Sequence, residues 1–484
     1  MSDSGHWSDL FSKARLTLRN PFELRNKPPI LGSKVALPGC ATYCHPWMTL
    51  PLARKPPAAS SQTVRPVRVA RFPRNRGQNP YLGLLDEALS SFGVELGAEP
   101  PFTLSWLWRA RREIHVLHFH WRPDFYYAWC RPAAYSRDPP PAALQGLGSW
   151  ITLVLFGVRL AAARLLGYRL MWTVHEIYPP ENNNRPPGSI SRRIDRLGGR
   201  LLARVSDVLY AHDSATAERA REELGRPAKG IEVVPHGSFI GVYPAGRPRL
   251  AVKAELRIAD DAFTFLCFGQ LRPDKSVKLL LEAFCSTEDP HLALVVAGQV
   301  LDDRSRDALV EAAASDSRIR LLLETVSAER VRELFDASDA LVLARSEAWT
   351  SGSLILALSL GLPVVAARLS PYEELLDAGR AGWLFRPGDA DSLRAALLQA
   401  AADPGLGAKR AAALQQGERL PRWSEIAAQL APRILQTLEA GNGRGWRVGR
   451  RAALPPIRVD EGSRSRSALG DRETCRPVER ESFR

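Results

Sequence analysis

The sequence of 484 residues predicts an α/β protein with two Rossmann-like, doubly wound domains that face each other across a cleft. Three observations predict this fold class. Apolar runs of strand length alternate with helical segments through most of the chain. The alternation restarts after a loop that contains Pro and Gly, near residue 246. The chain is also too long for one compact domain.

Both ends of the chain are predicted to lie outside the folded domains. Residues 1–66 are rich in Pro, Ser and basic residues, with one short helix expected near residues 9–18. Residues 441–484 repeat Arg, Gly, Ser and Pro. Because segments of this composition bury little apolar surface, we expect a disordered, basic and Pro-rich N-terminal segment and a disordered, Arg-rich tail.

The first domain is expected over residues 67–245. Its elements are predicted as a strand at 67–70, a helix at 81–92, strands at 116–120 and 170–175, a helix at 189–205, and strands at 208–210 and 231–234. Asn79-Pro80-Tyr81 opens the first helix, where Pro is favoured. The most apolar stretch, 150–174, is interrupted by Arg side chains. We therefore expect an amphipathic helix at 151–166 followed by a strand, and no membrane-spanning helix.

The second domain is expected over residues 246–435. Its predicted strand and helix pairs are 264–268 with 277–285, 291–297 with 304–314, 319–323 with 328–337, 340–343 with 353–360, and 363–366 with 371–378, followed by a strand at 382–385. In a doubly wound sheet the ligand crevice lies beyond the carboxyl ends of the strands. The loops that follow these strands are therefore the candidate site.

The loop after the first of these strands suits a diphosphate. It reads Gly269-Gln270-Leu271-Arg272-Pro273-Asp274-Lys275 and precedes a helix N-terminus. A diphosphate is bound by backbone N–H groups, by the positive end of a helix dipole and by cationic side chains such as Arg272 and Lys275. The alternative is an ordinary loop with solvated cations.

Two further junctions have similar character. Gly298 follows the second strand, where the lack of a side chain permits close backbone approach. Glu347 precedes Ser351-Gly352-Ser353, which opens a helix after the fourth strand. This Ser and Gly pattern is typical of a helix N-cap, and the same hydroxyl groups would also receive a phosphate. Glu347 would then be placed to accept hydrogen bonds from sugar hydroxyl groups.

The formal net charge of +14 is spread unevenly. Residues 1–66 carry +6 and residues 441–484 carry +5, which leaves +3 for the rest of the chain. Within that rest, residues 67–245 carry +7 and residues 246–440 carry −4. No nucleic-acid partner is expected, because the folded part is only weakly basic. The basic first domain and the tails suit either an anionic acceptor and a membrane surface or a plain solvated surface.

Metal and disulfide frameworks are not predicted. The six cysteines are scattered, and Cys40 and Cys44 lack a second ligand pair that would complete a zinc site. A reducing, cytoplasmic location is expected, because no disulfide pattern and no N-terminal apolar run occur. His118, His120 and Trp121 follow another apolar strand, where they would either line an acceptor cleft or pack at the strand end.

The run from Phe268 to Gly388 resembles the donor domain of the family-4 retaining glycosyltransferases, also described as glycosyl transferases group 1, which have the GT-B fold. The matching pieces are Phe268-Gly269-Gln270-Leu271-Arg272-Pro273-Asp274-Lys275, Val296-Ala297-Gly298, Ser338-Asp339-Ala340, Ser346-Glu347, and the runs 357–366 and 382–389. The first half adds Thr173-Val174-His175-Glu176 and Val234-Pro235-His236-Gly237. The resemblance covers about residues 67–435, and its specificity lies in the order and spacing of the pieces.

The resemblance implies transfer of a sugar from a nucleoside diphosphate sugar to a hydroxyl group of a glycan, a lipid-linked or a small-molecule acceptor, with retention of configuration. It implies no metal and no cofactor besides the sugar nucleotide. The implied catalytic residues are His175, Arg272, Lys275 and Glu347, and the implied substrate-binding residues are Gly269, Gln270, Gly298, Ser351, Gly352, Ser353, Asn79 and His236. A cytoplasmic enzyme in peripheral contact with the inner face of the membrane, through its basic first domain and tails, fits this assignment.

Two departures from the family pattern concern the donor. Gly269-Gln270-Leu271 stands where the family has Gly-Arg-Leu, and Leu356 stands where the family has a Glu that holds the ribose. Glu347 lies one residue from the family's other Glu position. A GT-B-fold nucleotide-sugar epimerase and a catalytically lapsed nucleotide-sugar-binding protein are the alternatives. A dehydrogenase is disfavoured, because no Gly-x-Gly-x-x-Gly motif follows a strand with an acidic partner beyond it.

Overall fold

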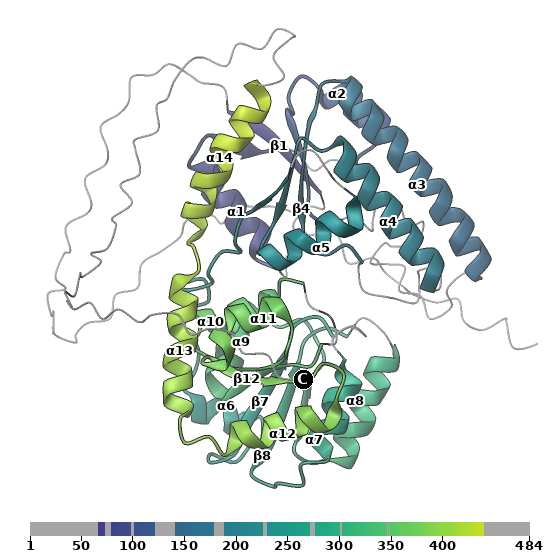
Figure 1. Cartoon of the computed structure of the whole chain (residues 1–484). Coiled ribbons are helices and arrows are strands. Elements are labelled where there is room, and N and C mark those ends of the chain that lie inside the picture. Colours follow the sequence, from purple (N-terminus) through teal and green to yellow (C-terminus); the bar gives the residue numbers. More distant parts are fainter. Residues whose placement is uncertain are drawn as a thin grey trace, which may run out of the picture. The chain divides into compact units, whose positions relative to one another are not determined.

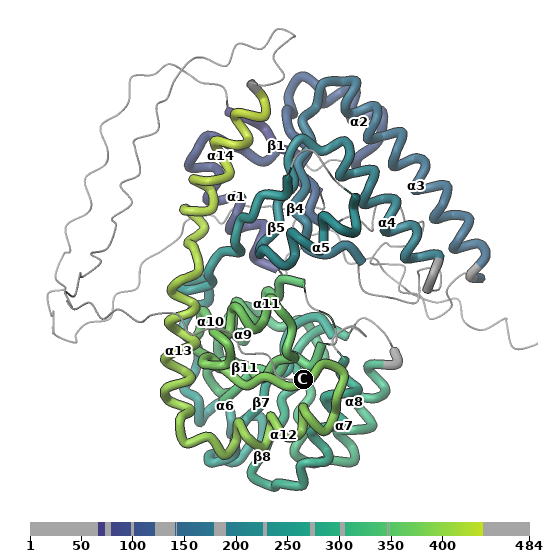
Figure 2. The backbone as a smooth tube through the Cα atoms, in the orientation of Figure 1, coloured from purple at the N-terminus to yellow at the C-terminus, as the bar shows by residue number. Residues whose placement is uncertain are grey.

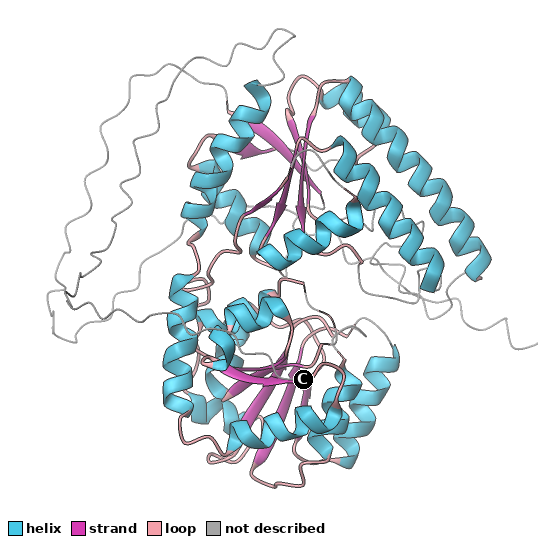
Figure 3. Cartoon of the chain, in the orientation of Figure 1, coloured by secondary structure: helices cyan, strands magenta, loops and turns pink. Residues whose placement is uncertain are grey.

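The structure is a computed structural model that describes residues 66–72, 79–97, 101–121, 141–178, 188–225, 230–271, 276–300, 303–345, 347 and 349–439. These residues all belong to one compact unit. They contain two six-stranded parallel sheets, each flanked by helices (Figures 1 and 3). The two-sheet α/β architecture predicted from the sequence is therefore confirmed. The predicted flanking segments, apart from residue 66, lie outside the described residues.

The first sheet has the strand order β2-β1-β3-β4-β5-β6, and all of its strands are parallel. Its elements are β1 (Val67–Phe72), α1 (Tyr81–Ser90), β2 (Val94–Leu96), α2 (Leu104–Ala110), β3 (Val116–Phe119), α3 (Ala142–Leu165), β4 (Arg169–Val174), α4 (Gly188–Val205), β5 (Val208–Ala211), α5 (Ser214–Leu224) and β6 (Ile231–Val233). Because every strand runs in the same direction, the residues after β3, β4, β5 and β6 share one edge of the sheet.

The second sheet has the order β12-β11-β10-β7-β8-β9. Its elements are α6 (Arg249–Glu255), β7 (Phe263–Phe268), α7 (Val277–Cys285), β8 (Leu292–Ala297), α8 (Asp303–Ser315), β9 (Ile319–Leu322), α9 (Ala328–Ala337), β10 (Ala340–Leu343), α10 (Gly352–Ser359), β11 (Val364–Ala367), α11 (Ser370–Leu375), the 3-10 helix Asp377–Gly379, β12 (Gly382–Phe385), α12 (Ala390–Ala401), α13 (Leu406–Arg419) and α14 (Trp423–Glu439). The chain reverses its direction of winding between β7 and β10, which makes the carboxyl ends of these two strands the switch point of the sheet.

Local sequence explains several element ends. All six residues of β8 are buried, as expected for a strand in a parallel sheet with helices on both faces. Asp213 caps α5 by accepting a hydrogen bond from Thr216 N, and Gly225 ends this helix with a left-handed φ of 59°. The predicted helix at 371–378 is shorter than expected, because Ala378 takes a left-handed conformation in the following 3-10 turn.

α3 differs most from its prediction, since it starts at Ala142 rather than at residue 151. Residues 142–150 include Gly146, Gly148 and Ser149, which are poor helix formers in isolation. In the structure α3 packs along α4, and a side chain added at Gly146 would meet Ile190 of α4. Tertiary packing therefore extends this helix beyond what its local sequence indicates.

The last helix returns to the first sheet. α14 packs against α1, which lies more than 300 residues earlier in the chain, and the tube view shows the two helices side by side (Figure 2). Ile426, Leu430 and Ile434 of α14 enter the same apolar cluster as Leu85 of α1. Trp423 Nε1 donates a hydrogen bond to Ser238 O at 2.9 Å. The predicted domain boundaries remain predictions, but this helix at the end of the predicted 246–435 domain packs on the first sheet.

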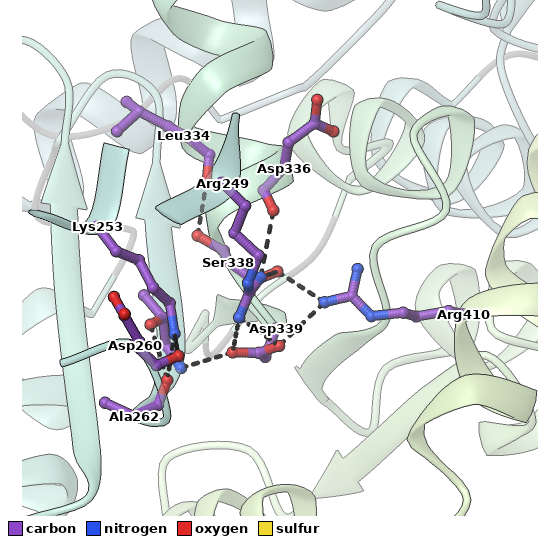
Figure 4. Close-up of polar contacts among 10 residues, drawn as sticks. Arg249, Lys253, Asp260, Ala262, Leu334, Asp336, Ser338, Asp339 and Arg410 are labelled. Atoms are coloured by element: carbon purple, nitrogen blue, oxygen red, sulfur yellow. Dashed lines mark hydrogen bonds and ion pairs between the residues drawn. The ribbon is translucent and has the colours of Figure 1, made fainter. Parts of the chain in front are cut away.

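A network of charged side chains around Asp339 lies at the end of the second sheet where β7 and β10 begin (Figure 4). The Asp339 carboxylate accepts hydrogen bonds from Arg249 at 2.7 Å, from Arg410 at 3.1 Å and from Thr264 N at 2.9 Å. Asp339 immediately precedes β10, and Thr264 is the second residue of β7. Asp339, in the Ser338-Asp339-Ala340 piece of the family resemblance, therefore joins segments of the fold. It lies at the amino end of β10, away from the carboxyl edge that carries the candidate site.

Candidate functional site

At the switch point of the second sheet, two glycine turns lie in direct contact. Gly269 follows β7 with φ 100°, and Gly298 follows β8 with φ 143°. A side chain at Gly298 would overlap the Gly269 carbonyl oxygen. Gly269 N donates to Ala297 O at 3.0 Å, and Leu271 N donates to Gln299 O at 2.8 Å. These bonds hold the two turns together, and the lack of a side chain at Gly298 permits the close approach of the Gly269 turn.

The N-terminus of α10 lies beside the same turns. Ser351 is buried and caps the helix by accepting a hydrogen bond from Leu354 N. Ser353 Oγ donates to Phe268 O, the last residue of β7, at 3.4 Å. A side chain at Gly352 would meet open space. The first turn of α10 therefore offers backbone N–H groups and the positive end of a helix dipole next to the β7 turn, which is an arrangement that binds phosphate.

The segment before α10 contacts α5 of the first half. Arg219 donates a hydrogen bond to Glu347 Oε2 at 2.9 Å, and its guanidinium stacks 4.2 Å from the centre of the Trp349 ring. Thr350 Oγ1 donates to Asp213 Oδ2 at 2.5 Å. Glu347 is more than half exposed, so its carboxylate is accessible while it is paired with Arg219.

Two sequence-predicted residues, Arg272 and Lys275, lie outside the described residues. The loop that carries them is described up to Leu271, which is buried and bridges to Val300. It is described again from Ser276, the residue before α7, whose φ is 51°. Gln270 lies between the Gly269 turn and this bridge, with its side chain exposed.

Five histidines gather at the carboxyl edge of the first sheet. They are His118 and His120 from β3 and the residue after it, His175 after β4, His212 after β5 and His236 after β6. His120 Nδ1 and His175 Nε2 share a hydrogen bond at 3.0 Å. His175 stacks on Trp121 with ring centres 4.3 Å apart. The sheet order brings these side chains together, because neighbouring parallel strands end at the same edge.

Tyr81 of α1 lies at the centre of this histidine group. Its ring centre is 5.1 Å from that of His175, 5.5 Å from that of His212 and 5.0 Å from that of His236. Asn79 Oδ1 accepts a hydrogen bond from Tyr81 N at 3.0 Å, and this contact opens α1. Asn79 therefore positions the helix that carries Tyr81.

Burial keeps the histidine group uncharged. Burial lowers the pKa of His118 to about 3 and that of His236 to about 3, and Arg71 adds to the effect at His118. Burial and the neighbouring histidines likewise hold the pKa values of His120 and His175 well below the ordinary range. At neutral pH these imidazoles are neutral, so each ring has one nitrogen that donates and one that accepts.

Several imidazole nitrogens in this group are buried without a hydrogen-bond partner among the described residues. They are His118 Nδ1, His120 Nε2 and His212 Nε2. A buried polar atom without a partner is costly. Despite the five histidines, no group of three or more His, Cys, Asp or Glu residues that could hold a metal ion occurs in the part of the chain that the structure describes.

The sequence pattern named His118, His120, Trp121, His175 and His236 as candidates but missed Tyr81, His212 and Trp423. The signal was present, because a histidine follows each of four successive strands directly or within three residues. Trp423 had no such signal, since only the return of α14 brings its ring to 5.2 Å from Tyr81. Leu356 of α10 is buried in the core of the second half, and its effect on ribose binding stays a prediction.

This chain is similar in sequence and in fold to known proteins. Residues 249–419 match the family model described as Glycosyl transferases group 1. The chain is 26% identical over 311 residues to the GDP-mannose:glycolipid 4-beta-D-mannosyltransferase of Xanthomonas campestris pv. campestris, and the match covers 64% of this chain and 76% of that protein.

Among solved structures, sucrose-phosphate synthase from Thermosynechococcus elongatus superposes with a TM-score of 0.58 at 15% identity, over 77% of this chain and 100% of that one. Alr3699/HepE of Anabaena in complex with UDP superposes with a TM-score of 0.55 at 17% identity, over 77% and 100%. The fold is therefore of the GT-B type, and residues 249–419 match the glycosyl transferases group 1 model.

Proposed function

We propose that this chain is a family-4 enzyme that transfers a hexosyl residue from a nucleoside diphosphate sugar to an acceptor hydroxyl group with retention of configuration. One observation carries the proposal. The Gly269 and Gly298 turns and the open N-terminus of α10 meet at the switch point of the second sheet, inside the domain that matches the family model. A protein of the same fold was solved with UDP, which supports a nucleotide at this edge.

Charge on the departing diphosphate is the main physical problem of this reaction. The dipole and N–H groups of α10 would stabilise it, together with Arg272 and Lys275 from the loop after β7. With these groups supplying the positive charge, the reaction would need neither a metal ion nor a cofactor besides the sugar nucleotide. Gln270 and Ser353 flank the same position and would donate hydrogen bonds to the diphosphate.

The histidine group would hold the transferred sugar and the acceptor. His175 is partly exposed and neutral, and its hydrogen bond to His120 fixes the orientation of its ring. We assign His175 to a sugar hydroxyl group and His236 to the acceptor side, with Glu347 available to a sugar hydroxyl once it leaves Arg219. The acceptor would be a glycan or a lipid-linked sugar, since the Xanthomonas relative is named for a glycolipid. The proposed location is the cytoplasm, at the inner face of the membrane.

Nucleotide release with an acceptor present tests this proposal. Purified protein is incubated with UDP-, GDP-, ADP- and dTDP-sugars and a lipid-linked acceptor, and NMR follows the product's anomeric signal. Arg272→Ala and Lys275→Ala should each lower kcat by about 100- to 1,000-fold, the effect of removing one charged donor to the leaving group. The matched control is Arg394→Ala, an exposed arginine on α12. Near-normal turnover in both site variants would reject the donor-site assignment.

Other outcomes identify the alternatives. Isomerisation of the donor without an acceptor would indicate an epimerase, and binding without turnover would indicate a lapsed binding protein. Inversion is a second candidate, because the relative is named for a β-linkage and the neutral His120–His175 pair could serve as the base that direct displacement requires. A product whose anomeric configuration is inverted relative to the donor would show direct displacement and not retention.

A further inference from the structure

α3 turns an apolar face to solvent. Along the helix, exposed apolar side chains recur three or four residues apart, as expected for one face: Leu144, Leu147, Ile151, Val154, Leu155 and Val158. Val154 is 64% exposed and Leu147 is 60% exposed. The opposite face is buried and contains the polar residues Gln145 and Ser149. Usual amphipathicity is thus reversed at the start of this helix, which indicates that its outer face has a partner.

The same face extends over neighbouring helices. Leu104 and Trp108 of α2 and Leu197 and Leu201 of α4 are also exposed. In the described part of the chain, more than half of the large apolar side chains that are exposed lie on these three helices. α3 contacts both α2 and α4, and the tube view shows the three helices together on one side of the first sheet (Figure 2). We call the outer side of α2, α3 and α4 the three-helix surface.

α3 is long and apolar enough to cross a membrane by length and composition, and no other helix of the described residues is. Its buried face, however, belongs to the core of the first half. Leu153, Phe156 and Leu160 pack in the same cluster as Trp172 of β4. Extracting the helix to span a bilayer would expose this cluster. The helix is therefore placed to lie along a membrane rather than through it.

The exposed charged side chains of α2, α3 and α4 are all positive. α4 exposes Arg192, Arg193, Arg196, Arg200 and Arg204, of which Arg196 is paired with Glu223 of α5 at 3.0 Å, and α2 exposes Arg109. α3 contains no acidic residue, and the one acidic residue of α4, Asp195, is buried. An apolar helix face beside a row of arginines is complementary to the acyl chains and anionic headgroups of a bilayer. A second copy of this chain would instead bring the same arginines against one another.

We propose that the three-helix surface docks this protein on an anionic phospholipid bilayer, with α3 lying in the interface and the arginines of α4 at the headgroups. Surface docking by the folded part goes beyond sugar transfer and does not depend on it. Docking would hold the enzyme on the bilayer that contains a lipid-linked acceptor, and α3 would not need to span that bilayer.

Flotation of the full-length protein tests the docking surface. The probes are vesicles of phosphatidylglycerol with phosphatidylethanolamine and, separately, vesicles of phosphatidylcholine alone. The parent protein should float with the anionic vesicles, and high salt should weaken the association. Ile151→Asp/Val154→Asp should reduce binding by about tenfold or more, because two charged groups enter the apolar contact. Arg193→Glu/Arg204→Glu should reduce binding to anionic vesicles by a similar factor and leave phosphatidylcholine binding unchanged.

The matched control is Val310→Asp on α8, since Val310 and Ile151 are both 53% exposed. Circular dichroism melts should show that all variants remain folded. Full flotation of the Ile151→Asp/Val154→Asp variant would overturn the proposal, and so would equal loss in the Val310→Asp control. A parent protein that forms a dimer dissolved by Ile151→Asp/Val154→Asp, without floating on any vesicle, would assign the surface to a second copy and also overturn it. Nucleotide release with a soluble acceptor should persist in the variants, which separates this result from failure of the proposed function.

Discussion

We call the Gly269 and Gly298 turns and the N-terminus of α10, where the nucleotide is proposed to bind, the nucleotide edge. One added methyl group should disturb this edge most at Gly298. Its φ of 143° is unfavourable for any residue with a side chain, and a Cβ atom would overlap the Gly269 carbonyl oxygen. We expect Gly298→Ala to lower the free energy of unfolding by about 2–4 kcal/mol, measured by urea denaturation. Displacing the Gly269 turn should also weaken nucleotide binding.

The control is Gly407→Ala in α13. Gly407 is exposed, has no neighbouring atom within reach of a Cβ and does not have a positive φ. Alanine there should stabilise the protein by up to about 1 kcal/mol through helix propensity. Equal urea midpoints for the Gly298→Ala variant and the parent would show that the two turns are not held as described.

The buried histidines predict an unusual sensitivity to acid. Their folded pKa values lie below the unfolded value of about 6.5. The unfolded chain therefore binds more protons, and the stabilisation is complete above about pH 6.5 and is lost as the pH falls toward 3. Each such histidine should contribute a slope of about 1.4 kcal/mol per pH unit in this window.

Denaturant unfolding at several pH values between neutral and about pH 4 measures this slope. His118→Asn should reduce it by about one histidine's share. His291→Asn is the matched control, because the His291 side chain is exposed just before β8. A slope in the parent no steeper than that of the His118→Asn variant would contradict the neutral, buried histidine group.

At the scale of elements, local sequence predicts the alternating strands and helices between residues 264 and 385 most closely. α7, α9, β10 and β12 have the predicted bounds, because short apolar strands and amphipathic helices carry strong periodicity. Seven elements were not predicted: β2, α2, α5, α6, α12, α13 and α14. β2, α2 and α6 are short, so their apolar patterns are brief. Gly269, Gly298, Ser351 and Ser353 lie at the strand-to-helix junctions that the sequence predicted, while their role in binding a nucleotide stays a prediction. The assembly around Tyr81 was not predicted, because it depends on strand order and on packing between distant segments.

α14 shows this dependence on distant packing. Nothing in its own sequence names α1 as its partner, yet Leu430 is buried against the core that contains Leu85. We expect Leu430→Ala to lower the free energy of unfolding by about 2–4 kcal/mol, the cost of a cavity in a packed core. Leu414→Ala on α13 is the control, because Leu414 is partly exposed and should cost much less. Equal losses for the two variants would mean that α14 does not complete the first half.

At the scale of the whole molecule, the described residues form four apolar clusters whose buried members lie between residues 67 and 434. The basic segments at residues 1–66 and 441–484, with +6 and +5, add charge to this core. We therefore expect a chain of residues 66–439 to unfold cooperatively and to keep its thermal shift with the nucleotide that stabilises the full chain. Calorimetry of the two proteins measures both properties.

The same shortened chain separates two sources of membrane affinity. If the three-helix surface docks the protein, the chain of residues 66–439 should still float with phosphatidylglycerol vesicles, because α3 and the arginines of α4 remain. Its association should weaken less steeply with salt, since about eleven net positive charges have been removed and fewer arginines and lysines meet the headgroups. A folded, nucleotide-binding core that no longer floats would assign membrane affinity to the flanking segments. Loss of cooperative unfolding would show instead that those segments take part in the fold.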